Sequence, residues 1–436
     1  MTTGLMTGLF FLSFGLALAL GFPIAFSLLG VSMVFALIFL GPTSLYFVFS
    51  STFAGFTRDV FMAIPLYIVM SSIIQFSGLG SALYDVMYKW FGSLRGGLAM
   101  GTVVICTLMA AMTGLGGTAV VTMGVIALPE MLKRNYSKDT ALGCIPAGGS
   151  LGPLIPPSAP AITLAAFGDL SVARLFIGGI VPGVLISFLF CAYIAIRCFL
   201  NPGLAPALPR ETRATWHEKL VSLRDVILPI LLVVAVLGSI YTGAATPTEA
   251  GAVGAGGAAL CALIYRRLTW RNLREALLFA LRVNGMVMWI MGGGVCMCAI
   301  LSATGASRWI GSLLVELPLA PIIVIILMQL TGLILGMFLD GATIKVITIP
   351  IFIPVVVALG FDPLWFGICF MVNTIIGYIT PPFGMNLFYT KGIASEDITM
   401  GDIYRAILPF AGIEAIVLIV CIAFPGMVLW LPNMMG

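Results

Sequence analysis

The chain carries one long pattern twice. Residues 80–157, shifted by 225 positions, fall without a gap on residues 305–382. The matched positions include glycines, threonines and prolines: Gly80 on Gly305, Gly116 on Gly341, Thr118 on Thr343, Pro129 on Pro354, Gly152 on Gly377, and Pro156-Pro157 on Pro381-Pro382. Both Pro-Pro pairs interrupt apolar stretches. A helix break that recurs in both halves of an apolar chain is typical of a transporter's binding site.

Composition places the chain in the membrane. Of its residues 61% are hydrophobic and only 9% are charged, and apolar runs of about 17–25 residues are long enough to cross a bilayer as helices. Strands of alternating polarity, which a membrane barrel needs, are absent from the sequence. No Lys or Arg precedes Arg58, and a cleaved signal peptide needs a basic start, so we expect the first apolar segment to be a retained helix.

Two foldings of the repeat compete. In the first, residues 97–132 form a re-entrant hairpin and 140–167 is a spanning helix broken at 155–158. In the second, the Pro-Pro segment is the hairpin tip and 97–132 crosses the membrane. Short cytoplasmic loops carry an excess of Lys and Arg, and the first folding gathers sixteen of these residues on one side against three on the other. We therefore adopt the first folding, which makes the two repeats inverted.

The predicted fold is an all-α polytopic membrane protein with inverted repeats, two re-entrant hairpins and two discontinuous helices. Its segments are N-terminal scaffold helices at 1–78, repeat 1 at 79–199 with a helix broken at 155–158, a cytoplasmic loop at 200–224, further scaffold helices at 225–301, and repeat 2 with the C-terminal helix at 302–436, broken at 379–382. Both tips and both breaks should meet near the bilayer midplane, where unpaired backbone is tolerated only around a cavity.

The breaks predict cation sites. Proline has no amide hydrogen and clashes with the carbonyl one turn back, so each Pro-Pro pair leaves several carbonyl oxygens unpaired. Such oxygens suit sodium in transporters with unwound helices. Nearby side chains add further oxygens: Thr113 and Thr118 in repeat 1, and Asp340, Thr343 and Thr380 in repeat 2. We predict two pseudo-equivalent sodium sites, with an anionic substrate between them at the half-helix N-termini.

Three further residues are candidate substrate contacts. Ser158 and Asn386 come just after the two breaks. Lys345 lies five positions beyond Asp340; it can pair across the tip, snorkel, or meet a substrate carboxylate, and the sequence does not choose among these.

The acidic residues within or at the ends of apolar segments have different expected roles. Asp340 at a tip indicates a role with a cation or a helix N-terminus. Glu249 begins an apolar stretch, where a carboxylate stabilises exposed amides, so we expect a structural cap. Glu414, in the last span, is expected to have a buried partner.

Several motifs carry a family resemblance. They are Pro146 to Gly152 running into Ile155-Pro156-Pro157-Ser158, Ala245 to Ala250, Gly336 to Asp340, Gly360 to Pro363, Asn373-Thr374, and Gly377 to Phe388. Together they resemble the large membrane subunit of a tripartite ATP-independent periplasmic (TRAP) transporter of the DctM or SiaM type, over nearly the whole chain. One departure is the first tip, residues 113–118, which has fewer hydroxyls than the family's Ser-Gly-Ser-Ser. At this tip we therefore expect backbone carbonyls, more than side-chain hydroxyls, to bind sodium.

The resemblance implies a sodium-driven elevator carrier in the bacterial inner membrane, with no enzymatic activity, no transition metal, and Na⁺ as coupling ion in place of a cofactor. Its partners would be a separate small four-helix membrane subunit (DctQ-type) and a periplasmic binding protein (DctP-type) that delivers a C4-dicarboxylate, sialic acid or similar carboxylate. The sodium ligands carried over are Thr113, Gly117, Thr118, Gly152, Ile155, Pro157, Asp340, Gly377 and Thr380. The alternative is a stand-alone carboxylate carrier that needs no binding protein.

Overall fold

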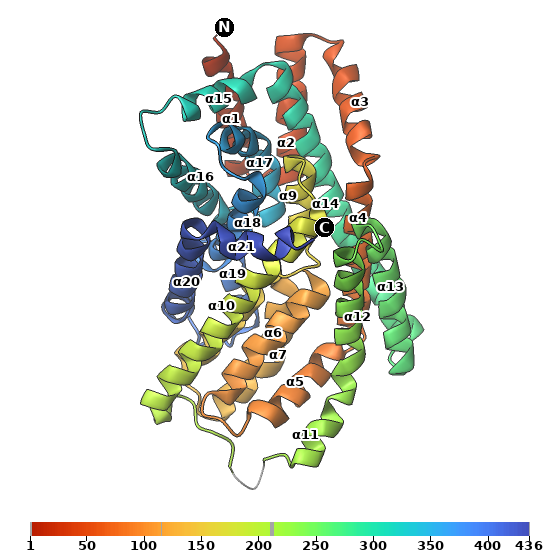
Figure 1. Ribbon diagram of the computed structural model, residues 1–436, viewed down its shortest axis with the longest axis vertical. Helices are drawn as coiled ribbons and strands as arrows, with labels where there is room; N and C mark the ends of the chain where they lie inside the picture. Colours follow the sequence, from red (N-terminus) through yellow and green to blue (C-terminus); the bar gives the residue numbers. More distant parts are fainter. Residues whose placement is uncertain (1, 115, 210–212, 436) are drawn as a thin grey trace.

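Helices make up the regular structure of the described chain. The computed structural model describes residues 2–114, 116–209 and 213–435, and over these residues it contains helices and no strand. The helices form an elongated bundle, with the N-terminal helices at one end and α11 at the other (Figure 1).

Repeat 1 and the helices before it follow one another with short connections. Their bounds are α1 (Thr3–Ala19), α2 (Ile24–Leu40), α3 (Ser44–Phe56), α4 (Asp59–Phe76), α5 (Leu79–Phe91), α6 (Gly97–Thr113), α7 (Gly116–Lys133), α8 (Lys138–Ser150), α9 (Ala159–Gly168) and α10 (Val172–Leu200).

The second half of the chain follows the same order. Its helices are α11 (Trp216–Ser222), α12 (Arg224–Tyr241), α13 (Pro247–Ile264), α14 (Trp270–Ala303), α15 (Ala306–Val315), α16 (Pro321–Gly336), α17 (Gly341–Ala358), α18 (Pro363–Ile379), α19 (Met385–Ile393), α20 (Met400–Ala423) and α21 (Pro425–Asn433).

The sequence repeat is also a repeat of helices. The antiparallel pair α6–α7 corresponds to α16–α17, and the interrupted helix α8–α9 corresponds to α18–α19. Each copy is preceded by a short helix, α5 or α15, which begins after a glycine in the left-handed conformation, Gly78 with φ 70° or Gly305 with φ 76°. A residue with a Cβ rarely adopts this conformation, so glycine permits the sharp entry into both helices.

Three local expectations were imprecise. The first break spans 151–158 and the second 380–384, because the helix unwinds before Pro156 and reforms only after Gly384. The C-terminal helix, expected as one span, is two helices, α20 and α21, that meet at Phe424 and Pro425, where proline interrupts the helical hydrogen bonds. Residues 44–56 also form a helix, α3, which the sequence analysis did not assign.

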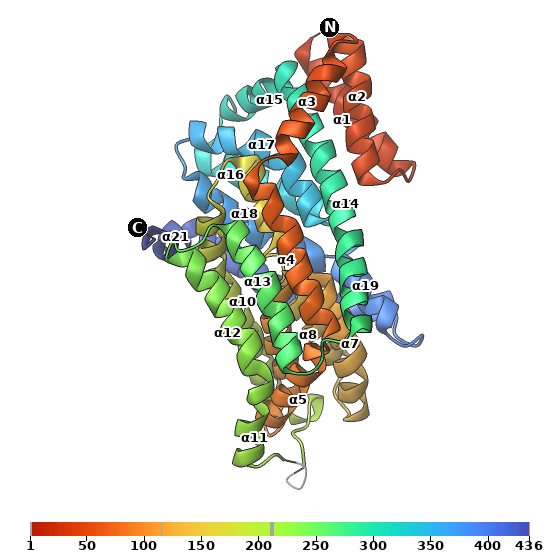
Figure 2. The same cartoon turned by 90° about the vertical axis from the view of Figure 1, so that its right-hand side faces the viewer.

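The helices assigned to the scaffold pack against one another. α4 contacts α13 and α14, while α14 also packs on α2 and α3; Figure 2 shows α14 running beside α3 and α4, which follow one another end to end. Glu249 caps α13, since its carboxylate accepts from the Thr246 amide at 2.8 Å while the Thr246 hydroxyl accepts from the Glu249 amide at 3.3 Å. The expected structural role of Glu249 is thereby confirmed.

By length and composition, six helices of the described chain can cross a membrane, or seven if the bent pair α11–α12 counts as one span. The breaks shorten α9 and α18, and the second tip ends α16. Each of these three helices is below spanning length on its own.

One end of the bundle gathers the segments expected to share a basic side. The Ser137 amide donates to the Leu204 carbonyl at 2.7 Å, and Lys138 pairs with Asp397 at 3.4 Å. The Leu98 amide donates to the Tyr136 hydroxyl at 3.3 Å, so α6 begins beside the end of α7. This is the geometry that the first folding requires. The depth of the pair in a membrane stays a prediction.

Candidate functional site

The first tip lies against the first break. Gly114, with φ 62°, sits so close to the Pro157 carbonyl that any Cβ there would overlap it. A Cβ on Gly116 would come within 2.5 Å of the Gly149 carbonyl oxygen. Small residues at the tip are therefore required, because the tip backbone contacts the backbone of the first break and of the end of α8.

The second tip lies against the end of α18, just before the second break. The Gly341 amide donates to the Tyr378 hydroxyl at 2.8 Å. A Cβ on Gly377 would lie 2.9 Å from the Cα of Gly336, at the end of α16. Because Gly336 and Gly377 have no side chains, α18 can approach the α16–α17 connection closely.

Both tips, Pro153 of the first break, and Tyr378 and Met385 on either side of the second break line one cavity of about 440 Å³, here called the tip cavity. Its far wall is formed by scaffold helices α4 and α14. The lining residues are Gln75, Gly114, Gly116, Gly117, Thr118, Val121, Pro153, Ala159, Pro160, Thr163, Phe279, Val283, Met286, Val287, Asp340, Ala342, Tyr378, Met385, Asn386 and Tyr389. Two segments 225 positions apart in the sequence thus meet in space, facing a largely apolar wall.

Asp340 is the one charged side chain among the described residues that line the tip cavity. It caps α17, accepting from the amides of Ala342 at 3.1 Å and Thr343 at 3.2 Å. The Thr343 hydroxyl also donates to it at 2.5 Å. A carboxylate has about four lone-pair positions, so these bonds leave acceptor capacity toward the cavity.

The first break offers unpaired backbone oxygens. Within the described chain, the carbonyls of Ile155, Pro156 and Pro157 accept no hydrogen bond. In contrast, the Pro153 carbonyl accepts from the Ser158 hydroxyl at 2.6 Å. Buried carbonyls are normally paired, so a group of free ones is suited to a hard cation.

The remaining predicted sodium ligands divide into two groups. Gly117 and Thr118 line the tip cavity together with Asp340. Gly152, Ile155, Pro157, Gly377 and Thr380 lie in or beside the breaks and are not among its lining residues. The hydroxyl of Thr380 donates to the Ile376 carbonyl at 2.6 Å and keeps its acceptor lone pairs. The side chain of Thr113 lies outside the described part of the chain.

The three predicted substrate contacts occupy different positions. Asn386 lines the tip cavity, with its amide donating to the Pro146 carbonyl at 3.2 Å. Ser158 caps α9 by accepting from the Ala161 amide at 3.2 Å, next to the cavity wall. Lys345 is fully buried on α17, does not line the cavity, and its ammonium has no hydrogen-bond partner among the described residues.

Sequence reasoning missed several wall residues. Tyr378 and Tyr389 line the cavity, and Gln75 projects from the end of α4. A glutamine in an apolar helix could have indicated from the sequence that Gln75 faces a cavity. The apolar residues of α14 carried none, because their role follows only from packing. The expected partner of Glu414 is Ser150, whose hydroxyl donates to its carboxylate at 2.6 Å, at the last residue of α8 before the break.

Comparison with known proteins gives consistent results. Residues 11–427 match the family described as tripartite ATP-independent periplasmic transporter, DctM component. The C4-dicarboxylate TRAP transporter large permease protein DctM of Pseudomonas aeruginosa is 35% identical over 409 residues, covering 94% of each chain. The sialic acid TRAP transporter large permease protein SiaM of Vibrio cholerae is 27% identical and covers 98% of this chain and 99% of its own length.

A third relative is a longer protein. The isethionate TRAP transporter permease protein DctMQ of Oleidesulfovibrio alaskensis is 29% identical over 94% of this chain but only 64% of its own length.

Among solved structures, the YdaH transporter of Alcanivorax borkumensis superposes with a TM-score of 0.69 at 14% identity, covering 98% of this chain and 99% of that one. MtrF of Neisseria gonorrhoeae gives a TM-score of 0.63 at 17% identity, over 92% and 86%. At these identities the likeness shows the fold alone.

Proposed function

The chain belongs to the DctM family of TRAP transporters, and from this premise we propose that it is the large membrane subunit of a sodium-coupled, elevator-type carrier of an organic acid. Membership of the family makes it a membrane transport protein and not an enzyme. Sodium coupling, the elevator movement and the identity of the cargo are the parts that we propose.

The tip cavity carries this proposal. Both tips and Pro153 of the first break line it, and Asp340 gives it a negative charge. An organic anion would be repelled by that charge alone. A bound Na⁺ offsets it, so cation and anion binding would favour each other, and this mutual dependence is what couples two fluxes.

The position of the tip cavity supports an inward-facing state. It is lined by Gln75 at the end of α4 and by Phe279 in the first half of α14. On that side, the loop that precedes α14 is basic. Its Arg267 donates to the Gly78 carbonyl, just after α4, at 2.6 Å. Basic loops lie on the cytoplasmic side, so we propose that the cavity opens toward the cytoplasm here and that the tips and breaks move as one block past α4 and α14.

The family name also implies partners. A TRAP large permease works with a small membrane subunit and a periplasmic binding protein, and we propose DctQ-type and DctP-type proteins for this chain in an inner membrane. The C4-dicarboxylate and sialic acid permeases among its relatives support a carboxylate as the cargo.

Reconstitution tests the proposal. We expect proteoliposomes with this chain, its small subunit and its binding protein to accumulate labelled succinate or sialic acid only under an inward sodium gradient. Full uptake driven by a proton gradient or ATP alone would contradict the coupling. Equal uptake by this polypeptide without the binding protein would instead favour the alternative, a stand-alone carboxylate carrier.

A further inference from the structure

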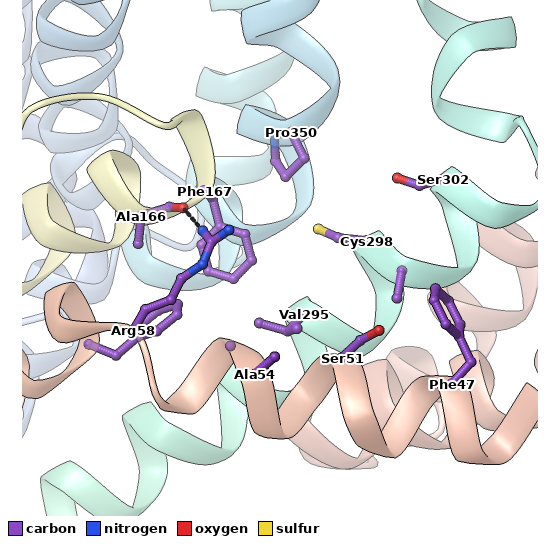
Figure 3. Close-up of a pocket in the computed structure, with 13 residues that line it drawn as sticks. Phe47, Ser51, Ala54, Arg58, Ala166, Phe167, Val295, Cys298, Ser302 and Pro350 are labelled. Carbon is purple, nitrogen blue, oxygen red and sulfur yellow. Dashed lines mark hydrogen bonds between the residues drawn. The ribbon is translucent and has the colours of Figure 1, made fainter.

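A second cavity lies between the scaffold and the block, on the side away from the basic loops. It has a volume of about 360 Å³ and is here called the Arg58 cavity. α3, α4 and α14 form its scaffold walls, while Ala166 and Phe167 of α9 and Pro350 of α17 close the other side. Figure 3 shows the Arg58 side chain reaching across to α9, with the Cys298 thiol and the Ser302 hydroxyl on α14 and the Ser51 hydroxyl on α3.

Arg58 is the one charged residue among the described residues that line this cavity. Its guanidinium donates to the Ala166 carbonyl at a long 3.4 Å, and none of the ion pairs of the described chain includes it. A guanidinium has five N–H donors, so most of them have no hydrogen-bond partner in the described chain. This is the chemistry that a carboxylate accepts in a bidentate manner.

The sequence repeat relates Arg58 to the α14 wall of the tip cavity. Shifting Arg58 by 225 positions places it on Val283, and aligning the ends of α4 and α14, at Phe76 and Ala303, places it on Gly285. Both fall in the Val283–Val287 stretch that lines the tip cavity. In an inverted repeat, the segment that faces the substrate site on one side has its counterpart facing the site on the other side.

The helix α9 links the two cavities. Ala159 and Thr163 line the tip cavity, while Ala166 lines the Arg58 cavity on the same face of the helix. Ala159 and Ala166 are two turns apart, which is about 10 Å at 1.5 Å per residue. A displacement of the block by this amount toward the Arg58 side brings the first break level with Arg58.

We propose that Arg58 is a binding residue for the organic anion in the outward-facing state, where it replaces the apolar wall that Val283 offers in the inward-facing state. This inference rests on the proposed elevator function. The anion would contact the Arg58 guanidinium in the outward-facing state and the aliphatic Val283 side chain in the inward-facing state. Anion binding is then stronger on the outer side, and anion release is easier on the inner side. Arg58 then contributes a directional preference that the symmetric backbone of the repeats lacks.

Cross-linking separates the movement from the role of Arg58. In a Cys298→Ala background, the pair Arg58→Cys with Ala166→Cys should cross-link with mercury in the present state. The pair Arg58→Cys with Ala159→Cys should cross-link only when the block has moved outward. A failure of the second pair, with the first one formed, overturns the elevator movement itself.

Thiol labelling tests the charge without a known substrate. Cys298 is native and its thiol faces the cavity (Figure 3). We expect a negatively charged methanethiosulfonate to label it about tenfold faster than a positively charged one, a ratio that a single charge-assisted contact can supply. Arg58→Gln should abolish this preference and Arg58→Lys should keep it. Equal rates in the native protein, or no labelling by either reagent, would show that the cavity does not attract anions.

Uptake then tests the directional role. In the sodium-driven assay, Arg58→Gln should raise the half-saturating concentration of the binding protein loaded with labelled succinate or sialic acid about tenfold, with an unchanged half-saturating sodium concentration. Efflux of the same substrate from loaded vesicles should change less than twofold at saturating internal concentration. Equal losses of uptake and efflux, or unchanged uptake, would overturn the proposal while sodium-driven transport by the native protein still stands.

Discussion

The two tip-and-break pairs share a backbone plan but obtain their oxygen atoms differently. At the first pair the tip is rich in glycine, and the carbonyls of 155–157 accept no hydrogen bond in the described chain. At the second pair Asp340 supplies a carboxylate, while break carbonyls are partly occupied: that of Thr380 accepts from the Gly384 amide at 3.1 Å, and that of Pro382 from the Tyr404 hydroxyl at 2.6 Å.

This difference shows how an inverted repeat can diverge without losing its shape. The close approach of tip and break constrains the glycines and prolines, which therefore recur in both copies. The ligand chemistry is not constrained in that way. We infer that the first site depends on backbone geometry and the second on a charged side chain, and each half of this statement can be tested separately.

The largest effect is expected at Asp340. Asparagine is as good a helix N-cap as aspartate, so Asp340→Asn should retain α17 while removing the charge. Loss of a charged ligand is worth about 2–3 kcal/mol, or roughly 100-fold in sodium affinity. The measurement is the sodium concentration that gives half-maximal uptake.

Asp362 provides a matched control for this substitution. It caps α18, accepting from the amides of Leu364 at 2.7 Å and Trp365 at 3.1 Å, and it does not line the tip cavity. Asp362→Asn should leave the sodium dependence unchanged. Similar losses in both variants would mean that Asp340 acts as a cap only, and the contrast between the two sites would disappear.

A smaller effect is expected when the equivalent glycines of the two tips are compared. A Cβ on Gly116 would lie 2.5 Å from the Gly149 backbone oxygen, whereas one on Gly341 would lie 2.5 Å from the Tyr378 hydroxyl, the end of a side chain. Backbone cannot move aside, so Gly116→Ala should destabilise the protein by about 2–3 kcal/mol and Gly341→Ala by about 1 kcal/mol. Thermal unfolding in detergent measures both. A larger loss for Gly341→Ala would contradict the idea that the first site depends on its backbone.

The sequence allowed the paired breaks, the tips and the helical fold to be predicted, because glycine and proline act on the backbone locally. The width of the first break was underestimated because Gly152 and Pro153 unwind the helix before the Pro-Pro pair begins. The α14 wall and the bond between Glu414 and Ser150 were not predictable, since neither depends on local pattern. Sodium ligation by all nine predicted residues, Gly152, Pro157 and Gly377 among them, stays a prediction.

The smallest effect separates side-chain from backbone ligation within the second site. Thr380 donates its hydroxyl hydrogen to the Ile376 carbonyl and so presents its lone pairs to the break. Removing one neutral oxygen ligand costs about 1 kcal/mol, so Thr380→Ala should raise the half-saturating sodium concentration about fivefold. Thr390 makes the same kind of bond, to the Asn386 carbonyl at 2.8 Å, but lies within α19, so Thr390→Ala is the control and should leave sodium dependence unaltered. If the two variants behave alike, Thr380 contributes helix stability alone, and the charge of Asp340 is what distinguishes the second site from the first.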